Sequence, residues 1–433
     1  MQILLTLSVA IFAGLMLSRL AKKLKLPAVT AYLIAGVLIG PFVLGKLGVA
    51  GLGFIESDII SGKYSLLSDI ALGFIAFAIG NEFRLAQLKK IGKQATVIGI
   101  FQAVFTTLLV DAALIGVHFI IGDKLPLPAA IVLGAVAAAT APAATLMVVR
   151  QYKAKGPVTD VLLPVVALDD AVGLIVFSIS YGIAKAFING KISIISVLVE
   201  PVLEVALSLI LGFVVGAIFT FFEKFFHSRS KRLAMSVAFV LATVGISKLS
   251  YTLPIAGGIH LAISPLLTCM MLGTIFCNMC DFSENLMDRL DRWTAPLFIL
   301  FFVISGAEFE LSILGNITIV IIGVIYILVR CLGKYLGARI SSQMVKSDPN
   351  IIKYLGITLF PQAGVALGMA IKAREMGTVN GTDIGEIVAN ITLFAVLIYE
   401  LVGPMLTKIS LLKAGEIDPE GAVSARQKKE KQI

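Results

Sequence analysis

Apolar runs long enough to cross a lipid bilayer recur along this chain from its first residues to about residue 410. A transmembrane helix needs about 20 mostly apolar residues. With 58% hydrophobic and only 15% charged residues, the chain lacks the polar surface that a soluble domain requires. We therefore predict an all-α polytopic membrane protein. The charged segment from about Leu411 to Ile433 is expected to form a disordered cytoplasmic tail.

Thirteen apolar segments are predicted to form membrane spans. Their approximate limits are 2–21, 28–44, 66–83, 94–121, 128–149, 158–187, 194–222, 233–249, 254–279, 293–307, 313–340, 353–373 and 385–410. The second and tenth segments are short, so a count of twelve spans is the alternative. An odd total suits two inverted repeats of six spans each, joined by a linking helix.

Basic residues are distributed unevenly among the predicted loops, which tests this count. The loops after odd-numbered spans and the tail hold 25 Lys and Arg residues, whereas the loops after even-numbered spans hold 6. Because cytoplasmic loops carry the excess of Lys and Arg, we expect the N-terminus outside and the C-terminus in the cytoplasm. The net charge of +9 follows from this bias and does not require a nucleic-acid partner.

Two adjacent acidic residues, Asp169 and Asp170, lie near the middle of the sixth predicted span. An ionisable residue at the bilayer centre costs roughly 3 kcal/mol or more, so such residues mark function more often than charges elsewhere do. Adjacent carboxylates in a dry interior titrate as one coupled unit, for which protons and a small hard cation compete. This competition is what cation/proton exchange needs. The alternative is a structural pair held by hydrogen bonds.

Helix-breaking residues interrupt the fifth and twelfth predicted spans, which correspond to each other in the two repeats. A proline removes a backbone donor and disfavours helix at the residue before it, and interrupted helices at matching positions indicate a substrate site. Ordinary proline kinks are the alternative. Thr140 offers a hydroxyl oxygen there and Gln362 an amide. The residues concerned are Thr140, Ala141 and Pro142 in the fifth span and Pro361, Gln362, Gly364 and Gly368 in the twelfth.

Two basic residues, Arg330 and Lys334, are four apart in the eleventh span and share a helix face. One of them is expected to pair with an aspartate of the sixth span, although Lys334 as a snorkelling anchor is the alternative. Arg330 lies deeper and is expected to neutralise helix dipoles or another carboxylate. The remaining candidate acids are expected to serve helix ends or packing, and they are Glu82, Asp111, Glu200, Glu204, Glu308, Glu310 and Glu400.

No cofactor is expected. The histidines, at positions 118, 227 and 260, are scattered and predict no metal cluster. The sequence carries no Walker-type or dinucleotide-binding motif, which disfavours ATP-driven pumping.

Taken together, these motifs resemble the monovalent cation/proton antiporter family, in its second branch, and within it the bacterial Na+/H+ antiporters with paired aspartates. The most specific matches are ALDDAVGL at 167–174 and the G-K-x-L-G pattern of 333–337. The other matching stretches are 26–41, 71–92, 140–145, 328–340 and 361–368. The resemblance extends from the second predicted span to the twelfth.

The resemblance implies a homodimer in which the fifth and twelfth spans cross at unwound centres. It implies a transmembrane antiporter domain over 1–410. Within it, 1–92 and 233–311 form a dimer or scaffold part, 93–190 and 312–410 form a core transport part, and 191–232 form a linker helix. A cytoplasmic tail follows at 411–433. By motif position, Asp170 matches the cation-binding aspartate and Asp169 matches the neighbour that pairs with the lysine at Lys334. Some members carry an acid where this chain has Ala141.

The resulting expectation is a multi-pass protein of the bacterial inner (plasma) membrane that is no enzyme. It would act as a secondary active, electrogenic Na+(Li+)/H+ antiporter working by alternating access, with Na+ on Asp170 and Asp169. K+/H+ exchange is the runner-up. A cation-coupled symporter for an organic solute is the rival from another class, but the fifth and twelfth spans offer mainly small residues to such a solute.

Overall fold

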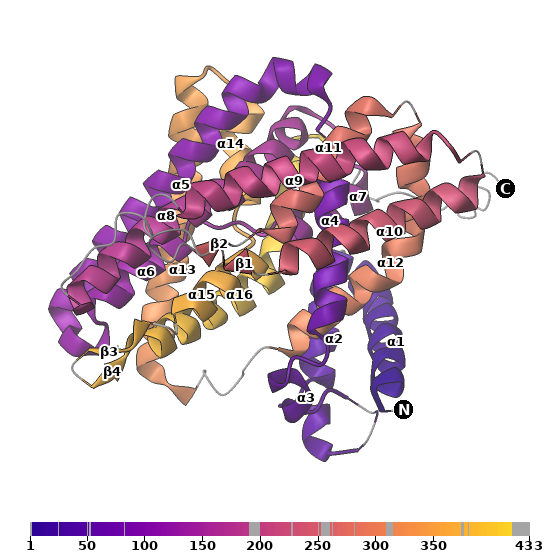
Figure 1. Ribbon diagram of the computed structural model, residues 1–433. Helices are drawn as coiled ribbons and strands as arrows, with labels where there is room; N and C mark the ends of the chain where they lie inside the picture. The colour runs from indigo at the N-terminus through magenta and orange to yellow at the C-terminus, as the bar shows by residue number, and fades with distance from the viewer. Residues whose placement is uncertain are drawn as a thin grey trace.

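A computed structural model describes residues 2–24, 26–49, 51, 53–81, 83–189, 200–226, 228–249, 251–252, 260–261, 263–280, 282–308, 315–373, 376–379 and 381–417. These residues form a bundle of helices (Figure 1). Strands within the described residues are confined to two short antiparallel pairs, β1 (Tyr251–Thr252) with β2 (His260–Leu261) and β3 (Thr378–Val379) with β4 (Thr382–Asp383).

The helices cover most of the described chain. Nine helical segments are long and apolar enough to cross a membrane, one of them being α2 with the turn that follows it (Ala28–Leu47), and α4, α6 and α11 are shorter apolar helices, counting described residues alone. The bounds are α1 (Gln2–Lys23), α2 (Ala28–Ile39), α3 (Glu56–Ile60), α4 (Ser65–Asn81), α5 (Leu85–Ile121), α6 (Leu127–Val136), α7 (Pro142–Tyr152), α8 (Pro157–Asn189), α9 (Glu200–Glu223), α10 (Arg229–Lys248), α11 (Pro265–Met279), α12 (Ser283–Ala307), α13 (Ile317–Met344), α14 (Pro349–Thr358), α15 (Gly364–Ala373) and α16 (Ile384–Lys413).

Each of the thirteen predicted segments contains a helix or a pair of half helices, so the prediction of an all-α polytopic protein is confirmed. The fifth segment is α6 with α7, and the twelfth is α14 with α15. The apolar span within α5 begins at Gly92, close to the predicted 94, although the helix itself begins at Leu85; the predicted start at 254 was wrong, since α11 begins at Pro265. At α11, Ser264 caps the helix by accepting from Leu267 N (3.4 Å), and a proline suits the first helical position.

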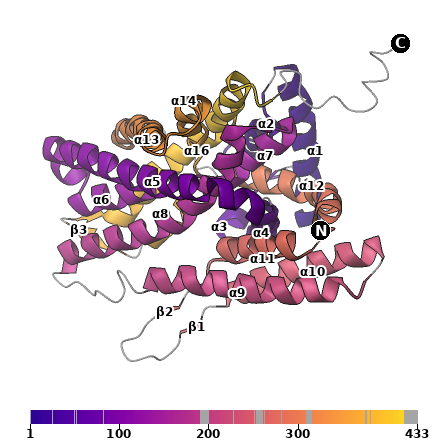
Figure 2. The ribbon, with the colours of Figure 1, turned by 90° about the horizontal axis from the view of Figure 1, so that it is seen from above.

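The helices form two groups (Figure 1). On one side α5, α6, α8, α13 and α16 pack on one another, and on the other side α1, α2, α4 and α12 do so. Seen from above, α9, α10 and α11 form a layer along one edge of the molecule (Figure 2). The half helix α7 contacts helices of both groups, namely α2 and α4 on one side and α8 and α16 on the other. The division into a moving core and a scaffold stays a prediction.

The chain remains ordered beyond the predicted end of the last span. α16 continues to Lys413 because Leu411 is fully buried, and Glu416 then accepts hydrogen bonds from Val158 N (2.6 Å) and Thr159 N (2.8 Å) at the start of α8. Acidic groups suit the N-terminus of a helix, where backbone N–H groups lack partners. Residues 411–417 were therefore wrongly assigned to a disordered tail, and 418–433 lie outside the described residues.

Candidate functional site

Two of the predicted membrane spans are interrupted at their centres, and the two interruptions are in contact. The first break is residues 137–141 and the second break is residues 359–363. α6 ends at Val136 and α7 begins at Pro142, while α14 ends at Thr358 and α15 begins at Gly364. Between the breaks, Ala141 N donates to Pro361 O (2.8 Å). Proline is favoured at a first helical position, since its missing N–H would have no intrahelical partner there. The predicted pair of crossing interrupted helices is thus confirmed.

Arg330 of α13 binds the backbone of both breaks. Its Nε donates to Ala137 O (3.0 Å) and its Nη2 to Ala139 O (2.6 Å), just beyond the end of α6. Its Nη1 donates to Phe360 O in the other break (2.7 Å). The guanidinium also stacks on Tyr399, 4.5 Å from the ring centre. Because the carbonyl end of a helix carries partial negative charge, this contact is the dipole neutralisation expected of Arg330.

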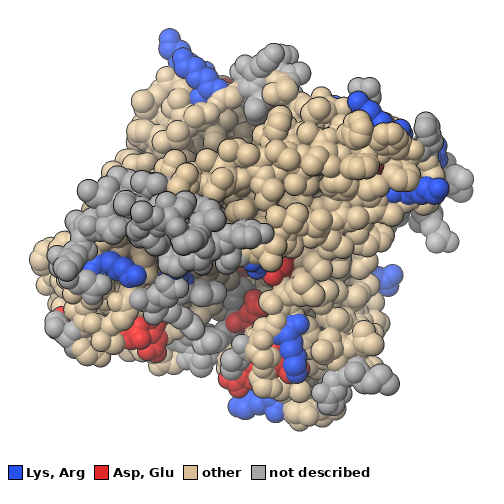
Figure 3. Space-filling view, viewed as in Figure 1, with Lys and Arg blue, Asp and Glu red and all other residues tan. Residues whose placement is uncertain are grey.

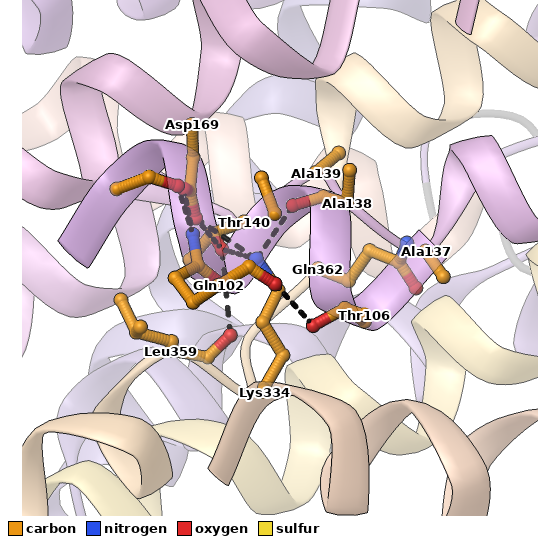
Figure 4. Close-up of polar contacts among 12 residues, drawn as sticks. Gln102, Thr106, Ala137, Ala138, Ala139, Thr140, Asp169, Lys334, Leu359 and Gln362 are labelled. Carbon is orange, nitrogen blue, oxygen red and sulfur yellow. Dashed lines mark hydrogen bonds and ion pairs between the residues drawn. The ribbon is translucent and has the colours of Figure 1, made fainter. Parts of the chain in front are cut away.

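Lys334, one turn further along α13, reaches Asp169 of α8 (Figure 4). Its Nζ lies 2.9 Å from Asp169 Oδ2, 2.9 Å from Thr140 Oγ1 and 2.5 Å from Ala138 O. Both charged side chains are 0% exposed, so the interpretation of Lys334 as a snorkelling anchor is wrong. A buried ion pair offsets its desolvation only when further hydrogen bonds accompany it, and Thr140 and Ala138 supply these.

The Asp169 carboxylate accepts hydrogen bonds on both oxygens. Thr140 Oγ1 donates to Oδ2 (2.6 Å), beside Lys334, and Gln102 of α5 donates to Oδ1. Sequence analysis missed Gln102. The available signal was a polar stripe in the fourth span, where Gln102 and Thr106 share a face at four-residue spacing. Thr106 Oγ1 donates to Gln102 O (2.6 Å) one turn back within α5.

Gln362 is the polar side chain of the second break. Its Nε2 donates to Val136 O (2.8 Å), the last residue of α6, and lies 3.1 Å from Tyr326 Oη. The side chain is fully buried. The amide of Gln362 therefore connects the second break to α6 and α13 by hydrogen bonds. Gly364, also predicted to support the site, is the first residue of α15.

Asp170 follows Asp169 within α8, but its side chain lies outside the part of the chain that the structure describes. Its role as the cation ligand stays a prediction. Glu82 and Glu310 also lie outside the described residues, as do His227 and the side chains of Glu200 and His260.

Two cavities lie at opposite ends of α4. The first, of about 850 Å³ and called the Arg150 cavity here, is lined near the end of α4 by Asn81 and Arg84 together with Arg150 and Asp291, which form an ion pair. It reaches Pro164, which is little more than a turn from Asp169 along α8.

The second cavity, of about 780 Å³ and called the Glu400 cavity here, begins at Ser68 and Asp69 in the first turns of α4. It reaches Ala143 of α7 and Ala363 just before α15, which adjoin the two breaks. The crossing therefore lies between cavities that enter the molecule from its two ends.

Comparison with known proteins gives one family and several relatives. A family profile described as sodium/hydrogen exchanger, transmembrane, matches residues 7–413. The chain is similar to Na(+)/H(+) antiporter 1 of Methanocaldococcus jannaschii, with 25% identity over 341 residues, which is 76% of this chain and 75% of that protein. It is also similar to the high-affinity Na(+)/H(+) antiporter NhaS3 of Synechocystis sp., with 26% identity over 423 residues, 89% of this chain and 86% of that one.

Solved structures share the fold. The sodium proton antiporter MjNhaP1 from Methanocaldococcus jannaschii at pH 8 superposes with a TM-score of 0.68 at 21% identity, covering 95% of this chain and 99% of that one. The structure titled as an electron-microscopy map of the same antiporter gives a TM-score of 0.74 at 18% identity, covering 95% and 98%.

Proposed function

Because the chain belongs to the transmembrane sodium/hydrogen exchanger family, we propose that it is a secondary active antiporter that exchanges Na+ for protons. The two relatives above are Na+/H+ antiporters by name, and they match three quarters or more of this chain. The chain is a multi-pass membrane transporter, not an enzyme. Its proposed site is the carboxylate pair of Asp169 and Asp170, with Thr140 beside it.

The observation that carries the proposal is the buried ion pair between Asp169 and Lys334 at the crossing of two broken helices. A buried charge left without its partner costs several kcal/mol, so the lysine and an incoming cation compete for the same negative charge. When Na+ binds the aspartates, the attraction that holds Lys334 charged weakens, and the lysine can release its proton. Transport then moves net charge, and the membrane potential contributes about 2.3 kcal/mol per charge per 100 mV.

Alternating access is proposed on the basis of the two cavities. The broken helices place uncoiled backbone at the crossing, which is tolerated in a membrane only where it is buried in protein or lines a cavity. The Arg150 cavity is lined by segments that we expect on the cytoplasmic side, and the Glu400 cavity by segments expected outside. Opening each cavity in turn would expose Asp169 and Asp170 to one side at a time.

The test uses purified protein in acid-loaded proteoliposomes, to which Na+, Li+, K+ or an organic solute is added in turn. Proton efflux driven by Na+ is the expected result, whereas efflux driven by K+ alone would support the runner-up, K+/H+ exchange. Asp170→Asn keeps the shape of the side chain but removes its charge, and should abolish exchange while the protein stays folded. Asp58→Asn is the matched control, because Asp58 pairs with Lys63 away from the crossing. Exchange in Asp170→Asn would contradict the assignment.

The bacterial inner membrane as location, the cytoplasmic C-terminus and the homodimer belong to the same proposal. Thiol labelling of a single cysteine introduced at residue 430 in intact cells would test the orientation, since a cytoplasmic tail should be protected from an impermeant reagent. Native mass spectrometry of the purified protein would test the dimer.

A further inference from the structure

Glu400 of α16 is a buried carboxylate that the proposed exchange site does not use. The residue is 2% exposed, and its Oε1 has no hydrogen-bond partner among the described residues. An ionised carboxylate in the interior of a membrane protein is expensive, and such groups usually mark ion pathways. Glu400 was expected to serve a helix end or packing, yet it lies well inside α16 (Ile384–Lys413).

The face of α16 that carries Glu400 packs against the second break. A Cβ atom built on Gly403 would lie 2.9 Å from Pro361 Cγ and 3.1 Å from Pro361 Cα, so the two backbones are in close contact. Residues three apart on a helix share a face, which places Glu400 on the Gly403 side of α16. Glu400 therefore lies on the face of α16 that packs against the region between α14 and α15.

Glu400 also lines the cavity of about 780 Å³ that reaches both breaks. The other charged residues of this cavity are far more exposed. Lys248 and Asp69, whose side chains are 53% and 30% exposed, form an ion pair of 2.9 Å, and Glu308 is exposed as well. In the space-filling view of Figure 3, acidic side chains lie around a hollow in the lower half of the face that is shown. Glu400 is thus the one deeply buried acidic residue on the described lining, and its Oε1, without a hydrogen-bond partner among the described residues, lies buried beside the cavity.

The N-termini of α7 and α15 favour a negative charge at Glu400. α7 and α15 begin beside the same cavity, which is lined by Ala143 and Ala363, and helix N-termini carry partial positive charge. The residue preceding α7, Ala141, provides no side-chain cap. Arg330 and Lys334 neutralise the opposite, carbonyl end of α6. Glu400 is the deeply buried carboxylate of the cavity that adjoins the starts of α7 and α15.

We propose that Glu400 is a second binding site for the transported monovalent cation, occupied as the cation passes between the Glu400 cavity and the aspartate pair. Carboxylate oxygen is a fitting ligand for a hard cation, and water in the cavity would complete its coordination. The inference rests on the proposed function, because it takes Na+ as the cation.

The test presents Na+ to one face at a time, using right-side-out and inside-out membrane vesicles. When Na+ is added on the face onto which the Glu400 cavity opens, Glu400→Gln should raise the half-saturating Na+ concentration about tenfold. This corresponds to about 1.4 kcal/mol of binding free energy. From the other face the change should stay within about twofold. Glu400→Asp, which keeps the charge on a shorter side chain, should give a smaller shift from the same face only. Thr392→Val is the matched control, since Thr392 is a fully buried residue of α16 whose hydroxyl also has no hydrogen-bond partner among the described residues.

A purely structural role of Glu400 would impair exchange equally from both faces. An equal shift from both faces, or no shift in Glu400→Gln, therefore overturns the second site while leaving the proposed exchange intact. If the Glu400→Gln protein does not reach the membrane, the half-saturating Na+ concentrations of Glu400→Asp from the two faces are compared instead. If the unsubstituted protein shows no Na+-driven proton movement from either face, both the proposed function and the second site are contradicted.

Discussion

The two interrupted helices share a backbone design but differ in charge. The break between α6 and α7 is held by two cations, Arg330 and Lys334, and contacts the carboxylate of Asp169. Beyond one contact from Arg330, the side-chain hydrogen bonds described at the break between α14 and α15 are neutral and come from Gln362, Tyr326 and Thr140. Both interruptions separate two half helices of ten or eleven residues. The charged contacts are concentrated at one of the two breaks, and this inequality can be tested.

Removal of Lys334 should have the largest effect. Lys334→Gln leaves the Asp169 carboxylate buried and unpaired, which typically costs about 3–5 kcal/mol, and it removes the proposed proton carrier. Thermal unfolding of the purified protein should shift to lower temperature, and Na+-induced currents on a solid-supported membrane should vanish or exchange should become electroneutral.

Two further variants sharpen that result. Lys353→Gln, on the exposed surface of α14, should leave both measurements unchanged. The double variant Asp169→Asn with Lys334→Gln should recover much of the lost stability, because no unpaired charge remains buried. Normal currents with normal Na+ flux in Lys334→Gln would remove Lys334 from the mechanism.

Arg330→Lys should have an intermediate effect that is mainly on stability. The ammonium keeps the charge, but it cannot reproduce the planar fork that binds Ala137 O, Ala139 O and Phe360 O together. We expect a loss of about 2 kcal/mol in unfolding free energy. The comparison is Arg339→Lys at the exposed end of the same helix, which should be neutral. An Arg330→Lys protein as stable as the unsubstituted one would show that charge alone holds the breaks.

Gln362→Leu, at the neutral break, should have the smallest effect. It removes the hydrogen bond to Val136 O and leaves Tyr326 Oη without its amide partner, for a loss of about 1–2 kcal/mol. Electrogenic exchange should persist. Tyr326→Phe, which deletes only the hydroxyl, is the milder comparison. If Gln362→Leu abolished exchange as fully as Lys334→Gln, the two breaks would be chemically equivalent and the inequality would be refuted.

The principal charges of the site could be predicted from the sequence, because a charged residue inside an apolar run is costly and therefore conspicuous. Asp169, Arg330 and Lys334 all stand out in this way. Pro142 and Pro361 indicate the two breaks, because proline lacks the backbone N–H that a continuous helix needs. The sequence pattern predicted that one of the two basic residues pairs with an aspartate of the sixth span, and the family resemblance singled out Lys334 with Asp169, which are 165 residues apart.

What could not be predicted depends on packing between distant segments. Gln102 is a neutral amide in an apolar span, and nothing in its own segment shows that α5 brings it to Asp169. Glu416 looked like part of a charged tail, yet it caps the start of α8, which precedes it by more than two hundred residues. Such partners become visible only when the helices are placed in space.

The central claim is that Na+ and protons compete for the same carboxylates beside Lys334, and its most direct measurement is the half-saturating Na+ concentration for exchange over a range of pH. Protons occupying the aspartates exclude Na+, so the account predicts a rise toward about tenfold per pH unit as the pH falls through the titration range of the pair. The measurement uses purified protein in proteoliposomes with the membrane potential clamped to zero. A half-saturating concentration that does not change with pH would mean that Na+ and protons bind at separate sites, and would contradict the account.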